Sequence, residues 1–82
     1  MIDIVLETLD NGLLRATGRN DGRTIEYFEG QERDARVIIA KALKASAPAH
    51  ALPSGGYDMT YIRLNDAAAA VLYPRDRAVQ LA

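Results

Sequence analysis

The side chains with the most chemical potential lie in one Gly- and Pro-containing segment of the chain. His50 is the chain's single histidine, Ser54 stands before a Gly-Gly pair, and Asp58 follows. Ser, His and Asp are the residue types of a nucleophilic triad, and glycine amides can line an anion. The spacing lacks the nucleophile-elbow pattern, however, and a phosphate loop would need Lys and a hydroxyl residue after its last glycine. The segment is therefore interpreted as a turn, and no catalytic, cofactor or metal-binding residue is predicted.

A second group of candidate residues is basic. Three arginines surround a predicted hairpin and four further basic residues share the polar face of a predicted helix: Arg15, Arg19, Arg23, Arg33, Arg36, Lys41 and Lys44. Side chains of this kind contact phosphates. Ten basic and eleven acidic residues nevertheless give a net charge of −1, without the basic excess typical of nucleic-acid-binding domains. Nucleic-acid binding is therefore the alternative hypothesis.

Large aromatic, sulfur-containing and basic side chains occupy every second position from 57 to 63. Tyr57, Met59, Tyr61 and Arg63 would share one face of a predicted strand over 57–64. Tyr, Met and Arg are enriched in protein interfaces, so these four are the predicted partner-binding residues. The other face of this strand is also apolar, and period-two alternation leaves open which of the two is buried.

One amphipathic helix is expected between Gly30 and Ser46. Its apolar residues recur at helical spacing, opposite the basic face, and comprise Ala35, Ile38, Ile39, Ala42 and Leu43. Pro48 should end the helix near Ala47, because proline disfavours helical geometry in the residue before it. Before the helix, strands are expected over 2–9, 13–18 and 23–28, joined by turns rich in Asp, Asn and Gly.

The segment 67–73 has two interpretations. Four consecutive alanines favour a helix capped by Asn65 or Asp66, whereas the short Asn-Asp link and the sequence Val-Leu-Tyr at 71–73 favour a hairpin. We expect the hairpin, and a short terminal strand or edge segment over 78–81. The predicted fold is therefore one α+β domain over 1–82. It has an antiparallel sheet of four to five strands, with one helix across one face, in the order β-β-β-α-β-β.

The element order and the length of the chain resemble those of small phage-borne inhibitor proteins, including anti-CRISPR proteins. The resemblance covers the whole chain and implies a non-enzymatic protein that occupies a surface of a larger complex. The chain has no cysteine, no basic and apolar signal segment at its start, and no apolar run of membrane-spanning length. We therefore expect a cytoplasmic protein-interaction module with a protein partner, or a homodimer formed through an uncovered sheet face.

Overall fold

Three antiparallel strands begin the fold. The computed structural model describes residues 1–74. Strands β1 (Ile2–Thr8), β2 (Leu14–Asn20) and β3 (Arg23–Gly30) form a meander. The two connecting turns contain Gly12 at φ 85° and Gly22 at φ 83°, which are left-handed conformations that glycine adopts without steric cost. The meander predicted from the turn residues is confirmed.

The amphipathic helix is also confirmed. A 3₁₀ turn over Glu32–Asp34 leads into α1 (Ala35–Ser46), and all five predicted apolar residues of α1 are buried. The backbone N–H of Ala47 donates to the Leu43 carbonyl at 2.8 Å, and Pro48 follows. The helix therefore ends where the proline predicted.

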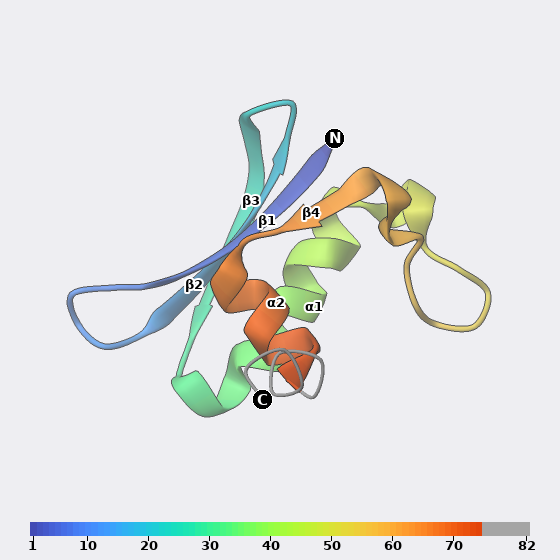
Figure 1. The fold of residues 1–82 in the computed structure, drawn as a ribbon. Coiled ribbons are helices and arrows are strands. Elements are labelled where there is room, and N and C mark those ends of the chain that lie inside the picture. Colours follow the sequence, from blue (N-terminus) through green and yellow to red (C-terminus); the bar gives the residue numbers. More distant parts are fainter. Residues whose placement is uncertain (75–82) are drawn as a thin grey trace.

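The sheet is mixed, which corrects the antiparallel sheet expected from the sequence. Strand β4 (Ile62–Leu64) pairs with β1 in parallel, and the strand order is β3-β2-β1-β4. The chain leaves the far edge of the meander at β3, crosses the sheet as α1, and returns beside β1. Because α1 reverses the direction of the chain after β3, the next strand runs in the direction of β1 (Figure 1).

The strand predicted over 57–64 is shorter than expected. Only Ile62–Leu64 forms a strand of the sheet, while Tyr57 makes an isolated antiparallel bridge with Ala51 and Met59–Tyr61 forms a 3₁₀ turn. A carboxylate oxygen of Asp58 accepts a hydrogen bond from the backbone N–H of Thr60 at 3.1 Å. This local capping interaction competes with the extended conformation that the alternating residues favour.

The hairpin expected over 67–73 is wrong, and the helical alternative is correct. Asp66–Leu72 forms α2, and the Asn65 side chain accepts a hydrogen bond from the Ala68 N–H at 3.1 Å. This N-cap and the high helix propensity of alanine outweigh the hairpin signal. The described element order is thus β-β-β-α-β-α, with two helices instead of one. The terminal strand expected over 78–81 lies outside the described residues.

Both helices pack on the same face of the sheet. Helix α1 lies across β2 and β3, α2 lies against β1 and β4, and the two helices touch each other (Figure 1). The core between them and the sheet is built mainly from Ile2, Ile4, Leu6, Ala16, Ile38, Ile39, Ala42, Leu43, Ile62 and Ala68. Within residues 1–74, this two-layer α+β arrangement leaves the second face of the sheet without a helix. Within residues 1–74, neither helix has the length and apolarity that crossing a membrane requires.

Candidate interaction site

The face of the sheet opposite the helices carries an ordered set of side chains, which we call the open face. Its middle row, set by the strand register, crosses from β3 to β1 through Tyr27, Thr17 and Val5. These positions alternate with the buried residues Ile4, Leu6 and Ala16, which point to the helices. The open face is therefore the one broad surface of the sheet that the described helices leave accessible.

The sign of the charged residues on the open face differs from one strand to the next. Strand β1 contributes two carboxylates, Asp3 and Glu7, and β2 contributes Arg19 and Arg15 directly opposite them. At the outer strands, Glu29 of β3 lies beside Arg15, and Arg63 of β4 lies beside Asp3. The face thus has an acidic column on β1 and a basic column on β2, flanked by the single charges Glu29 on β3 and Arg63 on β4.

Two ion pairs link these columns to the flanking charges. Nε of Arg63 donates to Oδ1 of Asp3 at 2.6 Å, and Nη2 donates to Oδ2 at 3.3 Å. The Arg63 hydrogen bonds are the main reason that the pKa of Asp3 lies below its ordinary value, and the charges of Arg63, the N-terminus and Arg19 act in the same direction. Asp3 in turn raises the pKa of Arg63. On the other side, Nη2 of Arg15 lies 3.4 Å from Oε2 of Glu29.

The middle of the open face combines a covered hydroxyl residue with an exposed ring. Thr17 is 7% exposed although neither described helix covers it, whereas the neighbouring Tyr27 is 51% exposed. The guanidinium carbon of Arg15 lies 4.7 Å from the centre of the Tyr27 ring, a cation–π geometry. Nε of Arg15 is buried and has no hydrogen-bond partner among the described residues. Arg15 and Tyr27 therefore pack against each other beside Thr17.

A hollow lies on the other half of the open face. It has a volume of about 300 Å³ and is lined by Val5, Asp3, Arg19, Arg63 and Asn65, among others. The open face therefore has an exposed aromatic side chain on β3 and a depression between β2 and β4.

No protein-family model, curated protein or solved structure matches this chain. The role of the open face therefore has to be inferred from its own geometry.

The four residues predicted to bind a partner do not form one strand face. Tyr57 and Met59 are half-buried and pack against the core, while Tyr61 is 54% exposed and its ring stacks on His50 at 5.2 Å. Only Arg63 lies on the open face. The 3₁₀ turn at Met59–Tyr61 breaks the alternation on which the prediction depended.

The seven basic residues divide between opposite sides of the molecule. Arg15 and Arg19 belong to the open face, and Arg23 begins β3. The other four are all exposed: Lys41 and Lys44 lie on the outward side of α1, Arg33 lies in the turn before it, and Arg36 lies on the side of α1 that faces α2. The sheet separates these two groups, so the seven basic residues do not form one continuous surface.

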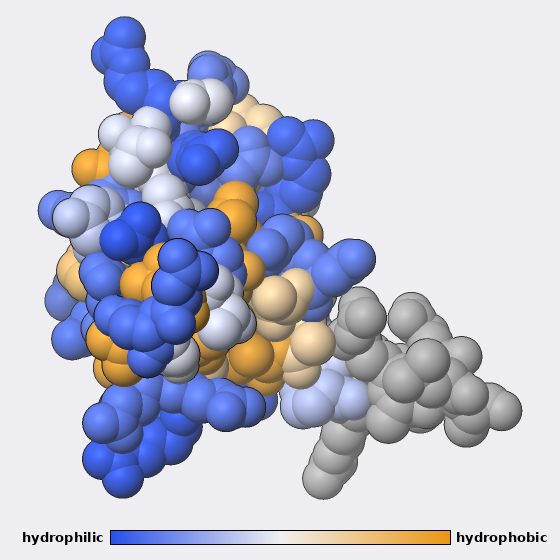
Figure 2. All heavy atoms as spheres, turned by 90° about the vertical axis from the view of Figure 1, so that its left-hand side faces the viewer, coloured by the Kyte–Doolittle hydropathy of each residue, from blue (hydrophilic) through white to orange (hydrophobic). Residues whose placement is uncertain are grey.

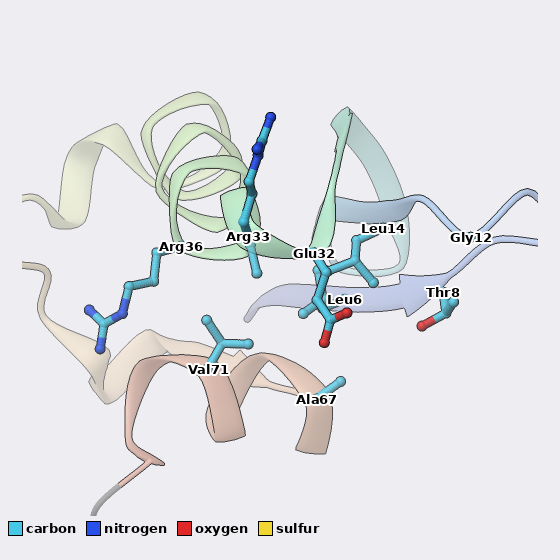
Figure 3. A pocket seen from close by; sticks show the side chains of 10 residues that line it. Leu6, Thr8, Gly12, Leu14, Glu32, Arg33, Arg36, Ala67 and Val71 are labelled. Carbon is cyan, nitrogen blue, oxygen red and sulfur yellow. The ribbon is translucent and has the colours of Figure 1, made fainter.

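A groove of about 480 Å³ lies between the start of α1, the start of α2 and the β1–β2 hairpin. Leu6 and Leu14 line it from the sheet and Val71 from α2, while Arg36 extends along its edge and Arg33 points away from it (Figure 3). Its walls are mainly apolar, and Glu32 is the one carboxylate among its lining residues. Besides this carboxylate, the charged groups that line the groove are the guanidinium groups of Arg33 and Arg36.

The segment around His50 forms a turn. Leu52 and Gly56 close it with a 2.8 Å backbone hydrogen bond, and the N–H of Asp58 donates to the His50 carbonyl at 2.8 Å. The Asp58 carboxylate is engaged by Thr60, which lowers the pKa of Asp58. Within residues 1–74, no group of three His, Cys, Asp or Glu side chains is placed to hold a metal ion.

Sequence reasoning missed the central residues of the open face, Val5, Thr17 and Tyr27. A partial signal was present in the strand alternation, because Val5 stands between the buried residues Ile4 and Leu6 of β1. Recognising the surface required the register, which places three residues from distant parts of the chain in one row.

Proposed function

We propose that this protein is a non-enzymatic protein–protein interaction module that binds its partner through the open face. The observation that supports the proposal most is the one-sided packing of the fold, because α1 and α2 both cover the same face of the sheet. The opposite face keeps a half-exposed tyrosine, several arginines and a hollow. Tyr and Arg side chains of this kind supply much of the binding energy in protein interfaces.

The form of the interaction follows from the polarity of the surface. Viewed from the side of the β1–β2 hairpin, the molecule is largely hydrophilic, with hydrophobic residues in small patches (Figure 2). On the open face, the charged residues of β1 and β2 lie beside Tyr27, so recognition would depend on charge complementarity around a small aromatic centre. A cytoplasmic protein of this kind, acting as an inhibitor that occupies a surface of a larger complex, agrees with the resemblance to phage-borne inhibitors.

Site-specific photo-crosslinking tests the proposal. A benzophenone amino acid replaces Tyr27 on the open face or, as the matched control, Val37 on the outward side of α1; these residues are 51% and 52% exposed. After irradiation in cells, we expect discrete protein adducts from position 27 and few from position 37. Arg15→Glu, introduced beside the label, should weaken those adducts. Equal labelling at both positions, or no adduct at position 27, would contradict the proposal.

The outward side of α1 supports a second candidate function, nucleic-acid binding. Helix α1 has no acidic residue, and none of its basic side chains forms an ion pair with another described residue. A row of unpaired basic side chains on one helix can contact successive phosphates of a nucleic acid. If this function is correct, Lys41→Glu with Lys44→Glu should abolish binding to RNA or DNA, and wild-type affinity should fall steeply with salt. Arg19→Glu, on the opposite side of the protein, is the control and should change binding little.

A further inference from the structure

The acidic column on β1 and the basic column on β2 make the open face complementary to itself. A two-fold axis parallel to the strands, between β1 and β2, would place β2 of one copy over β1 of the second copy. Arg15 and Arg19 would then lie over Glu7 and Asp3 of that copy, and the reverse contacts would form by symmetry. An axis perpendicular to the strands would instead place β2 over β2 and oppose arginines with arginines. The charge pattern therefore selects one mode of face-to-face packing.

The shape of the open face agrees with the same axis. Rotation about it carries β3 of one copy over β4 of the other, because the strand order is β3-β2-β1-β4. The exposed ring of Tyr27 would therefore meet the region of the hollow near Val5, Arg63 and Asn65. Thr17 of each copy would face Val5 of the other in the middle row. An exposed ring on one half and a hollow on the other half are what an isologous interface requires.

The usual spacing between two stacked sheets also suits contacts between these side chains. Sheets that stack face to face lie about 10 Å apart, with strand directions offset by about 30° because each sheet is twisted. Arginine and glutamate side chains on facing sheets can meet across this gap. The short residues Val5 and Thr17 would leave space in the middle that the Tyr27 rings can partly fill.

From these observations, and resting on the proposed function, we propose that the partner of the open face is a second copy of this chain. The homodimer is a two-fold pair of stacked sheets in which β2 arginines contact β1 carboxylates of the other copy. Each of these charged side chains already lies beside a residue of opposite charge in its own chain. Dimer formation therefore only replaces the water around these charges with charged side chains of the other copy. Its affinity should therefore be modest and should decrease with salt.

Charge reversal with heterodimer rescue tests the inference. Sedimentation velocity is run on the purified wild type, on Arg15→Glu and on Glu7→Arg, each across a range of concentrations at low salt. Either variant alone would oppose like charges at both symmetric contacts, so its dimer dissociation constant should rise by roughly tenfold or more. An equimolar mixture of the two variants restores opposite charges at both contacts and should sediment as a heterodimer. Circular dichroism of each variant checks that it is folded.

Two other variants locate the interface and serve as controls. Tyr27→Ser should weaken the dimer, because it removes the ring opposite the hollow. Lys44→Glu changes a charge on the far side of the sheet and should leave the dimer unchanged.

Three outcomes would overturn the inference. The wild type could stay monomeric at every concentration, both variants could dimerise like the wild type, or their mixture could fail to associate. A monomeric wild type whose Tyr27 position still crosslinks to a different protein would leave the proposed function intact and refute only the homodimer. A monomer without open-face adducts would refute both.

Discussion

The side chain of Asn65 forms two hydrogen bonds with the backbone of Leu6. They resemble the pair that a residue of a neighbouring strand would form. Oδ1 of Asn65 accepts from the Leu6 N–H at 3.0 Å, and its Nδ2 donates to the Leu6 carbonyl at 2.9 Å. The same Oδ1 accepts from Ala68 at the start of α2. One side chain thus extends the pairing of β4 with β1 and caps the next helix.

Replacing Asn65 by Ala should therefore destabilise the protein strongly. The change removes three hydrogen bonds and leaves the partly buried N–H and C=O of Leu6 without this partner. We expect a loss of about 2–4 kcal/mol in the free energy of unfolding, measured by urea denaturation. Asn65→Asp keeps the acceptor and loses the donor, so its loss should be smaller. The control is Asn20→Ala at an exposed strand end; an equal loss in that variant would contradict the assignment.

Gly18 is required by the close approach of β2 to α1. A Cβ atom at this position would overlap the Ser46 hydroxyl and lie 2.6 Å from the Ser46 Cβ. Gly18→Ala should therefore cost about 1–3 kcal/mol through overpacking, seen as a lower urea midpoint. Gly56→Ala is the matched control, because a Cβ there meets no atom within 4 Å and the backbone conformation is ordinary.

A double mutant identifies the clash partner of Gly18. Ser46→Gly removes both atoms that a Cβ at position 18 would strike. The loss caused by Gly18→Ala should then be smaller in the Ser46→Gly background than in the wild type. Additive losses would show that the cost arises elsewhere.

The ion pair between Asp3 and Arg63 should make a pH-dependent contribution to stability. Arg63 depresses the pKa of Asp3 in the folded protein below the ordinary value of 3.8. A depressed carboxyl pKa stabilises the fold above the unfolded-state pKa, and this contribution is lost as the pH falls through the folded-state pKa. The difference in unfolding free energy between wild type and Arg63→Ala should thus be largest near neutral pH. It should shrink as the pH falls below 3.8.

Two measurements check this dependence. Urea denaturation as a function of pH gives the stability difference, with Arg23→Ala as a control at an arginine outside the pair. NMR titration of the Asp3 carboxyl should show its pKa rising in the Arg63→Ala variant. An unchanged Asp3 pKa would contradict the role of the ion pair.

Local patterns in the sequence predicted most of the individual elements. Gly12 and Gly22 mark the hairpin turns, and the spacing of Ile38, Ile39 and Leu43 marks the buried side of α1. These signals concern neighbours within a few residues, so they are readable without the fold. The segment 67–73 was mispredicted because the alanines, the Asn-Asp link and the Val-Leu-Tyr run favour different local structures.

The sequence by itself therefore determined the meander, the amphipathic helix and the α+β class, since each depends on short-range periodicity and turn chemistry. The tertiary structure decided the parallel placement of β4 and the composition of the open face. These features depend on contacts such as that of Asn65 with Leu6, which joins residues 59 positions apart. They also depend on the register that aligns Val5, Thr17 and Tyr27. Such long-range pairings arise when the whole chain packs, and they leave no periodic signal in any one segment.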